Sequence, residues 1–292
     1  MPRGRKSKQE RADKQKRDWL KLPSDVTRNI LYKVGVIDIL ENAQKVCTAW
    51  RKICKDPSMW RVIYMTNFWD PNARPPLQDM CKHAVDRSQG QLVDLTIVDF
   101  GNDDLLLYVA DRASNLRRLE AAWCYEDIYN DWSVALKKFA VLEELSLYET
   151  GISEEAIETA GRYCPMLRTL KVNQRAITYS GEECEDMAIA IGKNLPELRH
   201  LELIGDSMSD IGLKAILDGC RHLESLDLRD CLNIDLKGDI VKRCSQQIKY
   251  LKVSNDSHEP YVYEVDSRIR YTPPTCSFVF VLYGCSCSED GC

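Results

Sequence analysis

The chain has 292 residues, enough for about two domains of roughly 150 residues each. Hydrophobic residues make up 44% of it and charged residues 29%, which is typical of a globular protein with a real core. The longest apolar run, Phe278–Tyr283, is far shorter than the ~20 residues of a membrane helix, and no apolar stretch follows the charged N-terminus as in a secretory signal. We therefore expect a protein of the nucleus or cytoplasm, with no membrane segment.

Charge is unevenly distributed along the chain. Residues 1–17 contain eight basic and two acidic side chains, whereas the whole chain contains 40 basic and 45 acidic ones. The remainder is therefore acidic, with a net charge of −11, which argues against nucleic acid as the main partner because phosphate contacts require a basic surface. The basic tail is interpreted as a nuclear-import signal or a weak polyanion contact, or else as a solvated, disordered end.

Thirteen cysteines are present, and without an export signal they argue against a disulfide framework. Cys164, Cys220 and Cys231 lie inside a repeated apolar pattern, where a free cysteine acts as a small buried hydrophobe. We expect most of these thiols to be packing residues in a reducing compartment.

Self-similarity is the dominant signal between residues 92 and 253. Seven segments have the form apolar-x-x-apolar-x-apolar, and their first residues lie 24, 26, 25, 31, 25 and 25 positions apart. The alternation predicts a short strand with one buried face, and the stretches between predict helices, with Ile211 on the buried side of one of them. A unit of this size cannot bury both faces alone, so the units must stack into a solenoid. The segments are 92–97, 116–121, 142–147, 167–172, 198–203, 223–228 and 248–253.

The repeats resemble the cysteine-containing leucine-rich repeats of plant F-box proteins, most closely at residues 220–231. The family's Cys or Asn, eight residues after the first leucine, is present only as Cys124 and Cys231; positions 100, 150, 175, 206 and 256 hold other residues. The resemblance implies an α/β leucine-rich-repeat solenoid, with a single curved parallel sheet and helices on its convex side.

Residues 18–65 differ in kind, because they lack the repeat and are rich in tryptophan. Leu-Pro, Ile-Leu, Val-Cys-x-x-Trp-Arg and Asp-Pro-x-x-Trp follow one another in an order that resembles the F-box, a small all-α module of three helices that binds the Skp-type adaptor of a cullin–RING ubiquitin ligase. The alternative is a helical cap on the solenoid, with Trp50 and Trp60 as its core. The adaptor-binding residues implied by the resemblance are Trp19, Leu22, Pro23, Ile30, Leu31, Val46, Cys47, Trp50, Pro57 and Trp60.

Catalytic motifs are not found in the sequence. The four histidines form no nucleophile–base pair by position, and no phosphate-binding loop or metalloprotease motif occurs. Four tail cysteines (Cys276, Cys285, Cys287 and Cys292) could hold zinc, but their spacing matches no standard finger. We therefore expect a protein that is not an enzyme, with no cofactor and no metal site.

The two modules together imply a substrate receptor of an SCF-type ligase, reaching cullin and RING subunits through the adaptor. A leucine-rich-repeat scaffold without ligase function is the alternative, and a metal-dependent regulator is a third possibility. The expected domains are a basic tail (1–17), an F-box (18–65), a solenoid of about seven repeats (66–255) and a C-terminal cap or disordered tail (256–292).

The target protein is expected on the concave sheet face and on a rim of two irregular loops. The long 31-residue interval places an insertion at 174–183, and residues 123–132 supply aromatic side chains at the same edge. The alternative for these aromatic rings is packing against adjacent repeats. The candidate target-binding residues are Trp123, Tyr125, Tyr148, Lys171, Asn173, Tyr179, His200, Glu202, Asp227 and Arg229.

Overall fold

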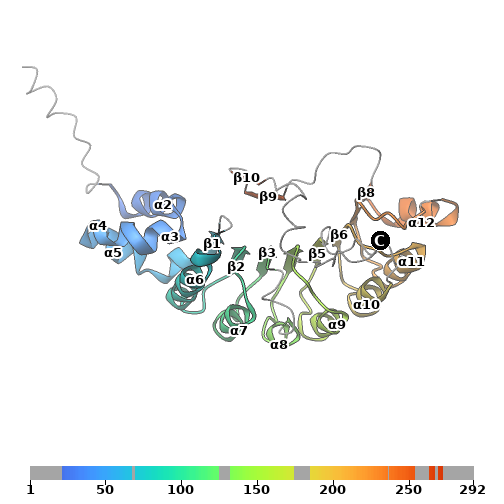
Figure 1. Ribbon diagram of the computed structural model, residues 1–292, viewed down its shortest axis with the longest axis horizontal. Helices are drawn as coiled ribbons and strands as arrows, with labels where there is room; N and C mark the ends of the chain where they lie inside the picture. The colour runs from blue at the N-terminus through green and yellow to red at the C-terminus, as the bar shows by residue number, and fades with distance from the viewer. Residues whose placement is uncertain are drawn as a thin grey trace, which may run out of the picture. The chain divides into compact units, whose positions relative to one another are not determined.

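The computed structural model describes residues 22–67, 70–124, 132–173, 185–235 and 237–253, together with the backbone of strands at 263–266 and 269–271. The chain divides into two units, Met1–Val253 and Ser254–Cys292. The described part of the first unit starts with six short helical segments and continues with strands that alternate with helices (Figure 1). The described part of the second unit is an antiparallel pair, β9 (Tyr263–Asp266) and β10 (Ile269–Tyr271).

The helical segments of residues 24–60 form three helical stretches. Gly35, at a φ of 95°, ends the first helix in a backbone conformation that favours glycine. Cys47 is extended, and its thiol accepts the backbone N–H of Trp50 at 3.4 Å, which caps the third stretch. The segments are α2 (Ser24–Val34), α3 (Val36–Asp38), the π-helical turn η3 (Ile39–Ala43), α4 (Gln44–Val46), α5 (Thr48–Cys54) and the 3-10 turn η4 (Pro57–Trp60).

An eight-stranded parallel sheet follows, with its strands in chain order. Each strand is four or five residues long, and adjacent repeats pair in register, so that equivalent residues lie side by side along the sheet. The strands are β1 (Val62–Thr66), β2 (Asp94–Val98), β3 (Arg118–Ala122), β4 (Glu144–Tyr148), β5 (Thr169–Asn173), β6 (His200–Ile204), β7 (Ser225–Leu228) and β8 (Tyr250–Val253).

Helices cover one side of this sheet, the outer side of the arc in Figure 1. Asn102, Ser153 and Ser209 cap three of them by accepting a backbone N–H from the first turn. Ile211 is 66% exposed, so its predicted inward position is wrong; Leu213, Ile216 and Leu217 fill the buried face instead. The helical segments are η5 (Pro71–Ala73), α6 (Arg74–Ser88), α7 (Asp103–Arg112), α8 (Trp132–Leu136), α9 (Glu154–Tyr163), α10 (Asp186–Asn194), α11 (Asp210–Gly219) and α12 (Asp239–Gln247).

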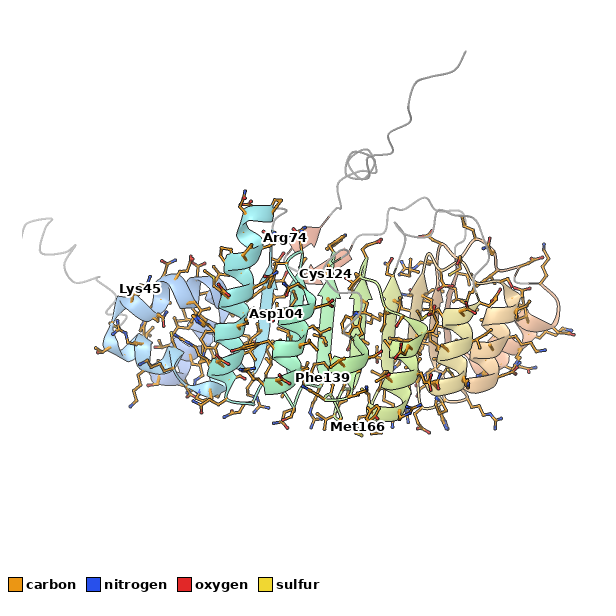
Figure 2. The ribbon with its side chains drawn as sticks, turned by 60° about the horizontal axis from the view of Figure 1, so that its bottom comes forward. Lys45, Arg74, Asp104, Cys124, Phe139 and Met166 are labelled. Carbon is orange, nitrogen blue, oxygen red and sulfur yellow. The ribbon has the colours of Figure 1, made fainter. Side chains whose placement is uncertain are left out.

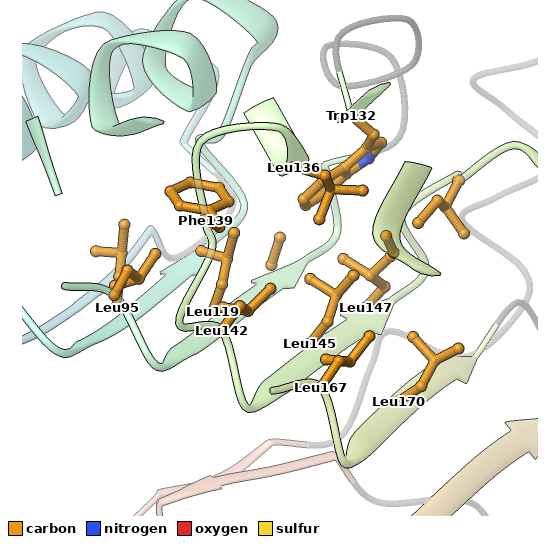
Figure 3. Close-up of a cluster of buried hydrophobic side chains, with 14 of the residues drawn as sticks. Leu95, Leu119, Trp132, Leu136, Phe139, Leu142, Leu145, Leu147, Leu167 and Leu170 are labelled. Carbon is orange, nitrogen blue, oxygen red and sulfur yellow. The ribbon is translucent and has the colours of Figure 1, made fainter. Parts of the chain in front are cut away.

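Leucines from successive strands stack into the core between sheet and helices (Figure 3). Leu119, Leu145 and Leu170 pair along the sheet, and each is almost completely buried. Trp132 and Phe139 fill the space above them from the helical side. The same core cluster includes Leu31 of the helical module and Ile248 of the last repeat, so the first unit has one continuous core.

The backbone leaves five strands of the sheet through a left-handed residue. Asp99, Trp123, Glu149 and Asp230 have φ between 48° and 63°, and Gly205 occupies the equivalent position at 73°. Such φ values are uncommon for residues with a side chain, and their recurrence makes this turn a structural feature of the repeat. Figure 2 shows Cys124 at the edge where strands end and Met166 at the edge where they begin.

Close approach of neighbouring helices depends on two glycines. A Cβ at Gly192 would lie 2.3 Å from the carbonyl oxygen of Ala215, and one at Gly219 would lie 1.7 Å from that of Gly192. Both distances are well inside van der Waals contact, so only glycine fits where α10 and α11 meet.

The predicted fold class, a leucine-rich-repeat solenoid behind a small helical module, is confirmed. Residues 62–65, assigned to the F-box from the sequence, belong to β1 and pair with β2. The basic tail, the loop at 174–183, the cysteines of the tail and the apolar run at 278–283 lie outside the described residues.

Candidate binding surfaces

Apolar side chains are exposed on the helical module. Val46, at the end of α4, is 62% exposed, and Tyr32, Val34 and Val26 on α2 are 50%, 42% and 39% exposed. Apolar side chains with this degree of exposure are available for contact with a partner. Pro23 is exposed as well, while Leu22, Ile30, Cys47, Trp50 and Pro57 are partly exposed.

Two of the predicted adaptor-binding residues are instead core residues. Leu31 is fully buried, and Trp60 is 1% exposed, with its indole N–H donating to the carbonyl oxygen of Cys54 at 2.9 Å. Both side chains therefore stabilise the module rather than form its surface. Trp19 lies outside the described residues.

Arg87 of α6 joins the helical module to the solenoid. Its guanidinium lies 5.3 Å from the centre of the Trp60 ring, and it donates to the side-chain oxygen of Gln44 at 2.9 Å and to the carbonyl oxygen of Cys54 at 3.4 Å. Cation–π contact and hydrogen bonds thus connect the two modules directly.

Charged side chains alternate along the inner face of the sheet. Arg118 pairs with Asp94 at 3.0 Å, with Glu120, and with Glu144 at 3.6 Å. Glu144 also accepts from Lys171 at 3.1 Å. Although burial alone would raise the pKa of Glu144, these two cations and the Ser146 hydroxyl lower it below its ordinary value.

A pocket of about 340 Å³ lies further along the same face, over β4 to β8. It brings together four of the predicted target-binding residues, which come from three adjacent strands: Lys171, His200, Glu202 and Asp227. Its other lining residues are Glu144, Thr169, Leu201, Ser225 and Lys252.

Asp227 is nearly buried and well paired within this pocket. Its carboxylate accepts from Arg229 at 2.8 Å and lies 3.6 Å from the ammonium group of Lys252. Glu202 lies beside Asp227 on the adjacent strand. Burial and the Asp227 carboxylate raise the pKa of Glu202, and the cations Lys171, Arg229 and Lys252 only partly oppose this shift.

Several of the residues predicted to bind the target on this face and at its rim are buried. Trp123 and Tyr148 are 5% and 7% exposed, and Asn173 is 1% exposed, so these three side chains are packing residues and offer a target little surface. Trp132 is buried too, with its indole N–H donating to the carbonyl oxygen of Gly151 at 3.0 Å. Tyr125 and Tyr179 lie outside the described residues.

In two repeats a polar residue occupies the position where the family has cysteine, eight residues after the first leucine. The Thr150 hydroxyl bonds to the carbonyl oxygen of Tyr148 at 3.1 Å and accepts the N–H of Cys124 at 3.3 Å. Asp206 accepts the N–H of Met208 at 2.8 Å, and burial raises the pKa of its carboxyl group. Both side chains satisfy backbone groups of the turn, as a cysteine would only weakly.

The thiols of the repeats are poorly suited to nucleophilic chemistry. Burial raises the pKa values of Cys81, Cys164 and Cys220 to about 12, which keeps these groups protonated at neutral pH. Within the described ranges, no three His, Cys, Asp or Glu side chains are grouped as metal ligands, and no helix there is both long and apolar enough to cross a membrane.

Known proteins share both modules. Residues 19–62 match the F-box domain. F-box/LRR-repeat protein 23 of Arabidopsis thaliana is 47% identical over 249 residues, which are 85% of this chain and 56% of that protein. F-box protein SKIP19, from the same plant, is 47% identical over 82% of this chain and 78% of its own length. Arabidopsis F-box/LRR-repeat protein 21 is 40% identical over 86% of each chain.

Proposed function

Because the chain belongs to the F-box/leucine-rich-repeat family of plants, we propose that it is the substrate-recognition subunit of an SCF-type ubiquitin ligase. The chain spans 56% of the first relative's length, so this role is proposed for the modules present here. The F-box would bind a Skp-type adaptor, and the inner sheet face would bind the protein to be ubiquitinated.

The observation that carries this proposal is the group of exposed apolar side chains on the F-box. Val46, Tyr32, Val34 and Val26 would be covered by an adaptor, which explains why a small module exposes so much apolar surface. The cullin and RING subunits would then be reached through the adaptor, without direct contact to this chain.

Such a receptor acts by proximity. It holds the target near a ubiquitin-charged conjugating enzyme and so raises the local concentration of target lysines. A direct connection between F-box and solenoid, such as the one through Arg87, favours this mechanism, because a flexible link would dilute that concentration.

Co-purification with a Skp-type adaptor tests the proposal. Val46→Glu places a charge in the proposed interface and should reduce adaptor binding by at least about tenfold, since burying an unpaired charge is costly. Val134→Glu is the matched control, because Val134 on α8 is 43% exposed but lies on the solenoid.

Equal adaptor recovery with Val46→Glu and Val134→Glu would contradict the proposed interface. A wild-type chain that brings down neither adaptor nor cullin would instead favour the alternative, a scaffold whose helical module only caps the repeats.

A further inference from the structure

The pocket on the inner sheet face contains one carboxylate that its neighbours leave available. Three carboxylates (Glu144, Glu202 and Asp227) and two ammonium groups (Lys171 and Lys252) line this pocket. Glu144 is paired with Lys171 at 3.1 Å, and Asp227 with Lys252 at 3.6 Å. Glu202 makes no hydrogen bond or ion pair with any other residue that the structure describes.

The strand register explains why Glu202 stands apart. It lies between Lys171 on β5 and Asp227 on β7, at equivalent positions of adjacent strands. Lys171 reaches away from it, to Glu144 on β4, and Arg229, directly after β7, forms its ion pair with Asp227. Glu202 and Asp227 therefore place two like charges side by side, an arrangement that disfavours the free protein.

A cation placed in the pocket would remove this repulsion. The direction of the Glu202 pKa agrees, because burial and the Asp227 carboxylate raise it even though Lys171, Arg229 and Lys252 act to lower it. An anion would fit poorly, because each of the two lysines is already paired with a carboxylate.

We propose that this pocket binds a basic side chain, lysine or arginine, of the target protein, with Glu202 as the counter-charge. The inference rests on the proposed function only in taking the ligand to be the target protein. The pocket volume of about 340 Å³ is within the range of small-molecule sites, so it can accept a single side chain. Ser225 and His200 at its edge can accept further hydrogen bonds from a guanidinium group.

Peptide selection tests the proposal and does not require the target protein itself. Random seven-residue peptides displayed on phage are selected on the immobilised full-length chain, and on its Glu202→Gln and Glu155→Gln variants. Glu155 is an exposed carboxylate in the first turn of α9, on the helical side, and serves as the matched control.

Peptides with lysine or arginine at one fixed position should be enriched on the wild-type chain and on Glu155→Gln, but not on Glu202→Gln. The best peptide, measured by calorimetry, should bind Glu202→Gln roughly tenfold more weakly, the effect of losing one charged hydrogen bond. Thermal unfolding of Glu202→Gln should occur at the same or a higher temperature, because the substitution removes a disfavoured charge.

Selection of acidic or uncharged peptides, of none, or of basic peptides that bind Glu202→Gln equally well would overturn the proposal. Adaptor co-purification is independent of this result, because Glu202 lies on β6 and the adaptor surface on the F-box. Failure of the basic-side-chain pocket therefore leaves the proposed ligase role standing, and failure of adaptor binding leaves the pocket standing.

Discussion

Some side chains of the repeat stabilise the backbone of the turn after the strand rather than filling the core. Cys231 is only partly buried, yet its thiol donates to the carbonyl oxygen of Leu203 at 3.0 Å, and burial and the Asp206 carboxylate raise its pKa to about 12. Thr150 and Asp206 hydrogen-bond to backbone groups of the equivalent turns in other repeats through their side-chain oxygen atoms. In these three repeats the position therefore holds a side chain that hydrogen-bonds to the backbone of the turn, whether or not it is cysteine.

We predict that Cys220 and Cys231 react slowly with N-ethylmaleimide in the folded protein at pH 8. Because a thiol with a pKa near 12 has roughly a thousandfold less thiolate than one near 9, both should be modified at least about 100-fold faster after unfolding. Mass spectrometry of labelled peptides at timed intervals measures each site separately.

Cys47 is the reference thiol for that experiment, because it is partly exposed on the F-box. If Cys220 were labelled as fast as Cys47 in the native state, its position in the solenoid core would be wrong.

At the scale of single elements, strands were predicted better than helices. The pattern of leucines identified seven strands, and the structure adds β1, where Trp60, Ile63 and Met65 repeat the same apolar spacing. Most of that segment lies inside the stretch that resembles an F-box, so the whole stretch was assigned to the F-box and this strand was not predicted. Helix faces were less certain, as Ile211 shows, because a ten-residue helix allows more than one apolar stripe.

The candidate site could be predicted only in part. Lys171, His200, Glu202 and Asp227 follow from the strand alternation, since alternate residues face one side of a sheet. Which carboxylate remains without a partner depends on side-chain directions across three strands, and the sequence carries no such information. The burial of Trp60 and Trp123 could not be predicted from the sequence either, because an aromatic residue of an interface and one of the core look alike in sequence.

Helix packing gives a second prediction at this scale. Gly192→Ala should lower the free energy of unfolding by roughly 1–3 kcal/mol, because its Cβ would overlap the backbone of α11 and force α10 and α11 apart. Chemical denaturation measures the difference. Lys214→Ala, at an exposed position of α11, is the control and should change stability by less than about 0.5 kcal/mol. Equal effects of the two substitutions would mean that the helices can separate freely.

At the scale of the first unit, F-box and solenoid share one hydrophobic core. β1 pairs with β2 immediately after η4, and α6 packs on the F-box through Arg87 and Trp60. The F-box/leucine-rich-repeat architecture is thus a single body here, because β1 begins only two residues after η4 ends at Trp60. We expect the two modules to unfold together, since neither can lose its core without exposing the other's.

Arg87→Ala tests that coupling. Loss of its stacking on Trp60 and of its two hydrogen bonds should lower the free energy of unfolding by about 1–2 kcal/mol and separate the single thermal transition into two. Differential scanning calorimetry resolves both effects. Arg112→Ala removes a comparable stacking contact, with Tyr108 at 3.7 Å, within the solenoid alone and should leave one transition. A single transition in both variants would show that Arg87 is not needed for coupling.

The in-register sheet has a geometric consequence for a ubiquitin ligase. Each parallel strand adds about 4.8 Å across the sheet, so the number of repeats between the F-box and β6 sets how far Glu202 lies from the F-box surface proposed to bind the adaptor. Because the core is continuous, that distance is fixed for every target. If the chain acts in the proposed ligase, then among proteins that bind equally well only those with a lysine at the matching separation from their docked segment would be ubiquitinated efficiently.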